Sequence, residues 1–78
     1  MDLQATFRLN LTRLLSQRGI TAYRLSKMSG VSQAALSLII RGQRGTTLSV
    51  LEAISTSLDI PPFALLIEGY NPGNNSED

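Results

Sequence analysis

The side chains of this chain that could take part in chemistry are mostly basic and lie in its first half. Seven basic residues against one acid, Asp2, give residues 1–44 a net charge of +6, whereas five acids and no base give residues 45–78 a net charge of −5. The basic residues are Arg8, Arg13, Arg18, Arg24, Lys27, Arg41 and Arg44. Guanidinium and ammonium groups gathered at one end of a molecule favour contact with phosphates, which the acidic end would repel. The alternative interpretation is that these charges only keep the protein in solution.

Other kinds of chemistry find little support in the composition. The chain has no Cys and no His, which excludes disulfides, thiolate metal sites and the most common general base. Its six acidic residues show no spacing typical of a catalytic carboxylate pair, and its glycines form no phosphate-cradling motif. We therefore expect no enzyme, no cofactor and no metal site.

The apolar pattern predicts an all-α fold, a compact five-helix bundle. Apolar residues recur every three or four positions, and a Ser or Thr precedes three of the segments as a suitable N-cap. The predicted helices span residues 3–18, 22–28, 33–41 and 48–58, followed by a short fifth helix that begins at Pro62 and is stopped by Gly69. The predicted core consists of Phe7, Leu11, Leu14, Leu25, Val31, Leu36, Ile39, Leu51, Ile54, Leu58, Phe63 and Leu66.

The length of the chain predicts one domain and a short tail. Residues 1–69 are expected to form the domain, whereas residues 70–78 are polar, acidic and broken by Gly and Pro, and are predicted to be a disordered acidic tail. No apolar run approaches the length of about 18 residues that a membrane span needs, and the N-terminus lacks the pattern of a secretory signal. We therefore expect a cytoplasmic protein with no membrane partner.

Residues 21–42, TAYRLSKMSGVSQAALSLIIRG, are the most informative part of the sequence. Gly30 permits a positive φ between two short helices, and Ser32 can cap the second. Two helices joined by such a turn are typical of the helix-turn-helix motif, whose second helix enters the major groove of DNA. On that helix, positions 34, 37, 38 and 41 form one stripe opposite Leu36 and Ile39, and the stripe is therefore expected to face outward.

From about Leu11 to Leu66 the sequence resembles the Cro/C1-type (XRE) helix-turn-helix family of phage and bacterial repressors, which have the lambda-repressor-like fold. The likeness includes the turn SGVS at 29–32, the segment RGQRGTTL at 41–48 and the segment LEAISTSLDIPPFALL at 51–66. The resemblance implies five helices, DNA binding and a two-fold dimer.

The resemblance also implies DNA-binding roles for individual residues. The amide of Gln33, at the start of the third helix, can both donate to and accept from adenine. Ser32 can cap this helix, touch DNA or do both, and Leu38 can contact a thymine methyl or pack against a neighbouring loop. Phosphate contacts are expected from the second helix and from the segment after the third. The predicted DNA-binding residues are Ser32, Gln33, Ala34, Ser37, Leu38, Arg41, Arg44, Arg24, Lys27 and Tyr23.

Three features depart from the family pattern. Ala22 stands where members commonly have Gln, and Ser29 stands where they usually have an apolar residue. Leu15 and Ile40 occupy the positions of an Arg and a Glu that often pair. Losing one partner of such a pair would leave a buried charge, at about 3–5 kcal/mol, whereas replacing both with apolar groups is often neutral. We therefore predict that Leu15 and Ile40 touch.

Together these features predict a transcriptional regulator, of repressor or controller type, that binds a palindromic operator in double-stranded DNA as a homodimer. The expected dimer surface lies around the fourth and fifth helices, with Phe63, Leu65 and Ile67 as candidates; the alternative for these residues is core or tail cover. The alternative function is a protein-interaction module, such as an antitoxin, with a second protein as its partner.

Overall fold

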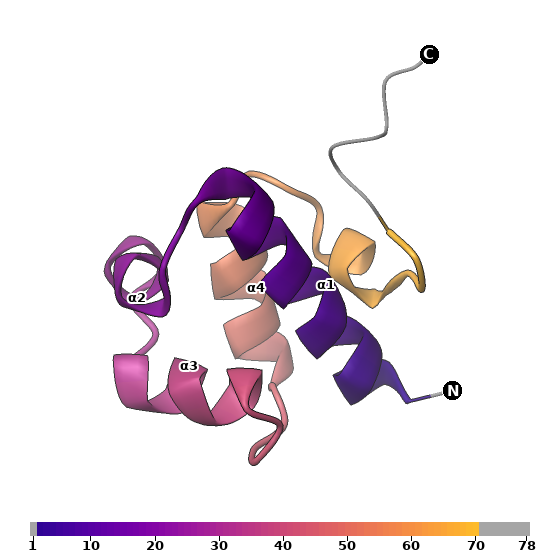
Figure 1. The fold of residues 1–78 in the computed structure, drawn as a ribbon, viewed down its shortest axis with the longest axis horizontal. Helices are drawn as coiled ribbons and strands as arrows, with labels where there is room; N and C mark the ends of the chain where they lie inside the picture. Colours follow the sequence, from indigo (N-terminus) through magenta and orange to yellow (C-terminus); the bar gives the residue numbers. More distant parts are fainter. Residues whose placement is uncertain (1, 71–78) are drawn as a thin grey trace.

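The computed structural model describes residues 2–70, which fold into four α-helices and one 3-10 helix (Figure 1). The elements are α1 (Leu3–Arg18), α2 (Ala22–Ser29), α3 (Gln33–Ile40), α4 (Leu48–Ser57) and the 3-10 helix η1 (Pro62–Leu66). Over these residues the all-α class is confirmed, and the four α-helices begin where they were predicted and end within one residue of the predicted positions. The predicted disordered tail lies outside the described residues apart from Tyr70.

Each α-helix begins at a side-chain cap that the sequence supplies locally. The cap oxygen accepts a hydrogen bond from a backbone N–H two or three residues later, at 3.1–3.2 Å, which satisfies a donor that has no partner within the helix. The capping residues are Asp2, Thr21, Ser32 and Thr47. Gly19 and Gly30 end α1 and α2 in the left-handed conformation, with φ of 67° and 79°. Helix bounds are therefore set by local chemistry.

The prediction of five helices is wrong, because the segment from Pro62 to Leu66 forms a 3-10 helix. The segment is only five residues long, little more than one turn of an α-helix, and it closes on i to i+3 bonds, such as that from Ala64 N to Pro61 O at 3.0 Å. Its inward residues are Ala64 and Leu65, whereas Phe63 is 64% exposed. The prediction that Phe63 belongs to the core is therefore wrong. Of the two alternatives for Leu65, a dimer surface or the core, the core is confirmed.

The side chain of Asn10 explains why Leu65 faces inward. Asn10, 2% exposed on α1, donates from Nδ2 to the carbonyl oxygens of Leu65 and Ile67, each at 2.9 Å. These two bonds fix the orientation of η1 against α1. Arg13 adds a bond from Nη1 to the carbonyl oxygen of Tyr70 at 3.2 Å. The register of η1 is thus set by its partner helix rather than by its own apolar pattern.

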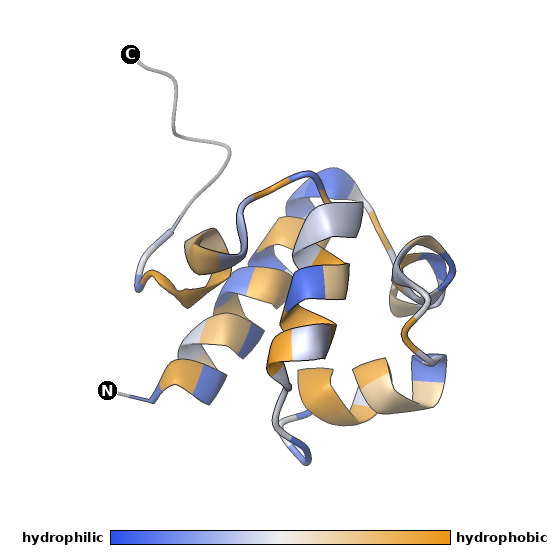
Figure 2. Ribbon diagram, turned by 180° about the vertical axis from the view of Figure 1, so that it is seen from behind, coloured by the Kyte–Doolittle hydropathy of each residue, from blue (hydrophilic) through white to orange (hydrophobic). Residues whose placement is uncertain are grey.

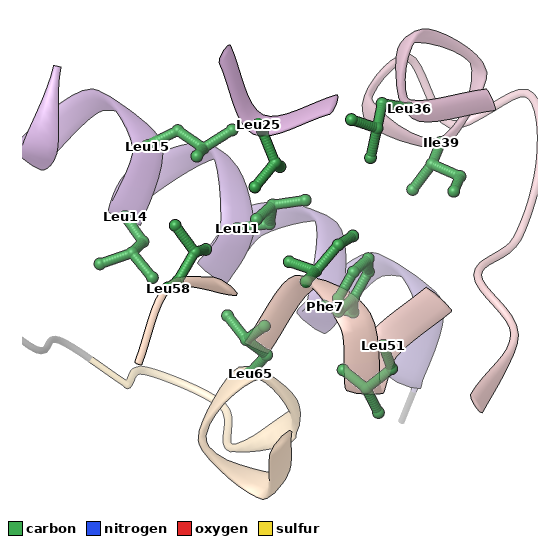
Figure 3. Close-up of a cluster of buried hydrophobic side chains, with 11 residues drawn as sticks. Phe7, Leu11, Leu14, Leu15, Leu25, Leu36, Ile39, Leu51, Leu58 and Leu65 are labelled. Atoms are coloured by element: carbon green, nitrogen blue, oxygen red, sulfur yellow. The ribbon is translucent and has the colours of Figure 1, made fainter. Parts of the chain in front are cut away.

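One hydrophobic cluster joins all five elements (Figure 3). α1 packs against α3 and η1, α2 packs against α3 and α4, and α4 packs against η1. The clustered side chains are Phe7, Leu11, Leu14, Leu15, Leu25, Leu36, Ile39, Leu51, Ile54, Leu58 and Leu65. Nine of the twelve predicted core residues belong to this cluster, while Val31 and Leu66 are only partly buried against it. In this arrangement α3 lies at one end of the domain, away from the C-terminal end of α1 (Figure 1).

Candidate nucleic-acid interface

The turn between α2 and α3 is fixed by hydrogen bonds and by a shared apolar contact. Leu25 and Leu36 are fully buried and bring the two helices together. Gly30, at φ 79°, donates to Ser26 O at 2.9 Å. The hydroxyl of Ser29 donates to Leu25 O at 2.8 Å and accepts from Val31 N at 3.2 Å. The polar residue at position 29 therefore has a structural role, because its hydroxyl ties the end of α2 to the turn.

The exposed end of α3 is its N-terminus. Ser32, Gln33 and Ala34 are all exposed there, whereas Ser37 and Leu38 further along are half-buried. Ser32 caps the helix, with its hydroxyl oxygen accepting from Ala35 N at 3.1 Å. Figure 2 shows that α3 is coloured toward hydrophobic over most of its length and toward hydrophilic at this end. Hydrogen bonding from α3 to another molecule is thus concentrated at its first residues.

The segment after α3 carries two exposed arginines. Arg41 donates from Nε to Ser37 O at 3.3 Å, so its guanidinium is drawn along the last turn of the helix. The loop then folds back on the helix, with Gln43 N donating to Leu38 O at 2.9 Å. Arg44 follows on this loop and is exposed. Both guanidinium groups are available to an anion beside α3.

The exposed face of α2 combines a tyrosine with two cations. Tyr23 is 55% exposed, and Arg24 and Lys27 are exposed beside it. The ammonium of Lys27 lies 5.4 Å from the centroid of the Tyr23 ring, within the range of a cation–π contact. Because Tyr23 and Lys27 are four residues apart on one helix, the contact keeps both on one stripe of α2. This stripe presents a hydroxyl and a positive charge together.

Comparison with known families identifies the domain. A family model described as the Cro/C1-type HTH DNA-binding domain matches residues 10–67. The chain belongs to this family. No curated protein and no solved structure matches the chain. Within residues 2–70, no helix of this Cro/C1-type domain is long and apolar enough to cross a membrane.

Two departures from the family pattern concern the interior of the Cro/C1-type domain. Leu15 belongs to the buried cluster, and Ile40 packs against that cluster while partly exposed. Both positions are therefore occupied by apolar side chains at the core, as an exchange of a charged pair requires, and the direct contact between them stays a prediction. Ala22, the first residue of α2, is half-buried and offers no polar side chain.

Two residues beside this interface were not among the predicted DNA-binding residues. Gln4 and Arg8 lie one turn apart on α1, and both reach the loop between α3 and α4. The amide of Gln4 donates to Thr46 O at 3.2 Å and accepts from Thr46 N at 2.8 Å. The spacing of four was visible in the sequence, but the loop that it contacts lies about 40 positions away. No local pattern could therefore have revealed the pairing.

Proposed function

We propose that this protein is a sequence-specific transcriptional regulator that binds a palindromic DNA operator as a homodimer, with α3 in the major groove. The observation that carries the proposal is the exposed N-terminal end of α3 in a Cro/C1-type domain, where Ser32 and Gln33 offer polar groups outward. The amide of Gln33 can form two hydrogen bonds with an adenine edge, which is a specific readout. Ala34 beside it leaves room for a thymine methyl.

Exposed cations on both sides of α3 supply the electrostatic part of binding. Arg41 and Arg44 follow the helix, and Arg24 and Lys27 precede it on α2. Phosphate contacts of this kind fix the position of a protein on DNA without reading its sequence. Because α3 is otherwise rich in apolar residues, we expect few direct base contacts and a larger contribution from phosphate contacts and DNA shape.

The proposed dimer surface is the exposed apolar side of η1. Phe63 and Ile67 are 64% and 47% exposed. Side chains three apart eclipse in a 3-10 helix, so Phe63 stands on the same side as Leu66. Leu66 lines an apolar groove of about 160 Å³ together with Leu3 and Leu48, which are themselves 50% and 82% exposed. A protruding aromatic side chain beside an apolar groove is self-complementary under a two-fold axis, which favours a second copy of this chain as the occupant.

Selection of bound duplexes from a random DNA pool tests this function. A dimeric helix-turn-helix protein should enrich an inverted repeat whose half-sites are centred about 10 base pairs apart. Gln33→Ala should relax the enriched sequence at one position per half-site and weaken binding by about 1–3 kcal/mol. Gln17→Ala is the matched control, because Gln17 is an exposed glutamine near the C-terminal end of α1, away from α3.

Two results would overturn the proposal. The first is a pool without enrichment of any sequence, since a sequence-specific regulator must prefer some duplexes. The second is an equal loss of affinity for all duplexes on Gln33→Ala, because Gln33 would then not read bases. Absence of DNA binding alongside a stoichiometric complex with another protein of the host would favour the interaction module instead.

A further inference from the structure

The first two turns of α1 and the loop after α3 enclose a groove at the edge of the helix-turn-helix motif. The groove has a volume of about 370 Å³, and it is lined by Asp2, Gln4 and Arg8 from the start of the chain and by residues 42–45 with Ile39. Its walls are fixed, because Gln4 forms two hydrogen bonds with the backbone of Thr46. A methyl group on Gly45 would come within 3.0 Å of Gln4 Nε2, so the loop approaches α1 closely.

The guanidinium of Arg8 lies in this groove and has no partner among residues 2–70. A methyl group on Gly42 would come within 2.7 Å of Arg8 Nη1, which places the guanidinium directly over the backbone of Gly42. Arg8 is half-buried, and within residues 2–70 it forms no hydrogen bond and no ion pair. A guanidinium has five N–H donors, and those of Arg8 meet no acceptor within these residues. The position of Arg8 therefore points to an anion from outside residues 2–70.

The electrostatics of the groove favour such an anion. Arg44 lines the groove as well, so two guanidinium groups face one carboxylate, that of Asp2. The Asp2 carboxylate is also held by the backbone N–H groups of Gln4 and Ala5, at 3.1 and 3.2 Å. A guanidinium has five donors in a planar fork that matches the oxygens of a phosphate.

We propose that this groove binds a phosphate of the DNA backbone, with Arg8 as its central ligand. The inference depends on the proposed function and adds to it a contact from α1, outside residues 21–42. Arg44 reaches the same phosphate from the loop, and Gln4 acts as a positioning residue that holds the loop against α1. The bound phosphate flanks the bases that α3 reads, so α1 contributes to affinity and not to sequence preference.

The test is the salt dependence of binding to a fluorescein-labelled duplex of random sequence, of about 20 base pairs, measured by fluorescence anisotropy with the full chain. Each phosphate contact adds about 0.9 to the slope of log K against log salt concentration. Arg8→Gln should therefore lower the slope by about 0.9 for each bound subunit, or about 1.8 for the dimer, and weaken binding of the dimer about 60-fold at 0.1 M salt. Arg8→Lys should restore most of the slope. Arg13→Gln is the matched control, because it removes the same charge from the same helix but from a side chain bonded to Tyr70 O.

A second variant keeps the fold and makes the groove more positive, whereas Arg8→Gln makes it less positive. Asn caps a helix about as well as Asp, so Asp2→Asn should leave α1 intact and remove the one negative charge that lines the groove within residues 2–70. Binding should become about threefold tighter, the effect of one unit charge about 6 Å away in water.

The outcomes separate this inference from the proposed function. Suppose that the wild type binds DNA in a salt-dependent way, that Arg8→Gln and Arg13→Gln have equal slopes, and that Asp2→Asn does not change the affinity. These results would overturn the groove as a phosphate site and leave the proposed function as a DNA-binding regulator standing. A wild-type chain whose DNA binding does not depend on salt overturns both.

Discussion

Replacing Asn10 by Ala should destabilise the domain by about 2–3 kcal/mol. The amide of Asn10 is the buried polar link between α1 and η1, with Nδ2 donating to Leu65 O and Ile67 O at 2.9 Å each. A hydrogen bond of this kind contributes about 0.5–1.5 kcal/mol net, and a buried carbonyl left without a partner costs about 1–3 kcal/mol. Ile67 O keeps its bond from Tyr70 N at 3.1 Å, so the larger penalty falls on Leu65 O.

One atom of the same amide reduces the expected loss. Asn10 Oδ1 is buried and has no hydrogen-bond partner among the described residues, and the substitution by Ala removes this unfavourable group. The net loss of stability on Asn10→Ala therefore lies toward the lower end of the range given by the two lost hydrogen bonds and the unpaired Leu65 carbonyl. Against a total stability of about 4–12 kcal/mol for a chain of this size, it remains a large fraction.

Urea denaturation and thermal unfolding measure the effect at one fixed protein concentration, since the proposed dimerisation would make stability depend on concentration. At about 4–8 °C per kcal/mol, Tm should fall by roughly 10–20 °C. Asn10→Asp keeps the size of the side chain but removes both donors, so it should be at least as destabilising. Ser16→Ala, on the exposed side of the same helix, should stay within about 0.5 kcal/mol of the wild type. An Asn10→Ala variant as stable as Ser16→Ala would refute the role given to this amide.

Three further predictions follow from the backbone and the surface. Gly42→Ala and Gly30→Ala should each lower the free energy of unfolding in urea by about 1 kcal/mol, because φ is 77° at Gly42 and 79° at Gly30. Only Gly42→Ala should also weaken duplex binding, since its methyl group displaces Arg8. Equal duplex binding by the two variants would contradict this prediction. Phe63→Glu should fold normally, because Phe63 is exposed, but it should sediment as a monomer where the wild type is expected to sediment as a dimer. A variant that still sediments as a dimer would show that η1 does not form the dimer surface. Asp59→Gly should raise stability by about 0.5–1 kcal/mol, because Asp59 has φ 59°, and a loss would show that its side chain matters more than its backbone.

Local signals in the sequence were sufficient for the α-helices and for the helix-turn-helix motif. A capping side chain and a left-handed glycine act within four residues, and so Thr21, Ser32 and Gly30 mark their boundaries without any knowledge of the fold. The same holds for the apolar spacing that places Leu25 and Leu36 in the core. Caps, left-handed glycines and apolar spacing are properties of a short segment, and the rest of the chain does not change them.

Contacts between distant residues decided what the sequence could not reveal. The inward side of η1 depends on Asn10, which lies 55 positions before Leu65, and the loop after α3 is fixed by Gln4, which lies 42 positions before Thr46. A polar side chain on a helix gives no local sign of the backbone groups that it will meet. For this reason the sequence left two alternatives open for Leu65 and gave no sign that Arg8 approaches the loop.

The central claim is that the N-terminal end of α3 and the loop after it form the DNA-binding surface, and amide chemical shifts of the ¹⁵N-labelled chain test it most directly. A duplex carrying the selected sequence should be titrated into the protein while each amide is followed. We predict that the largest shifts occur in residues 32–38 and 41–46 and that the exposed side of α4, at Glu52 and Thr56, is unaffected. Shifts confined to α4 and η1, with none in residues 32–38, would contradict the claim.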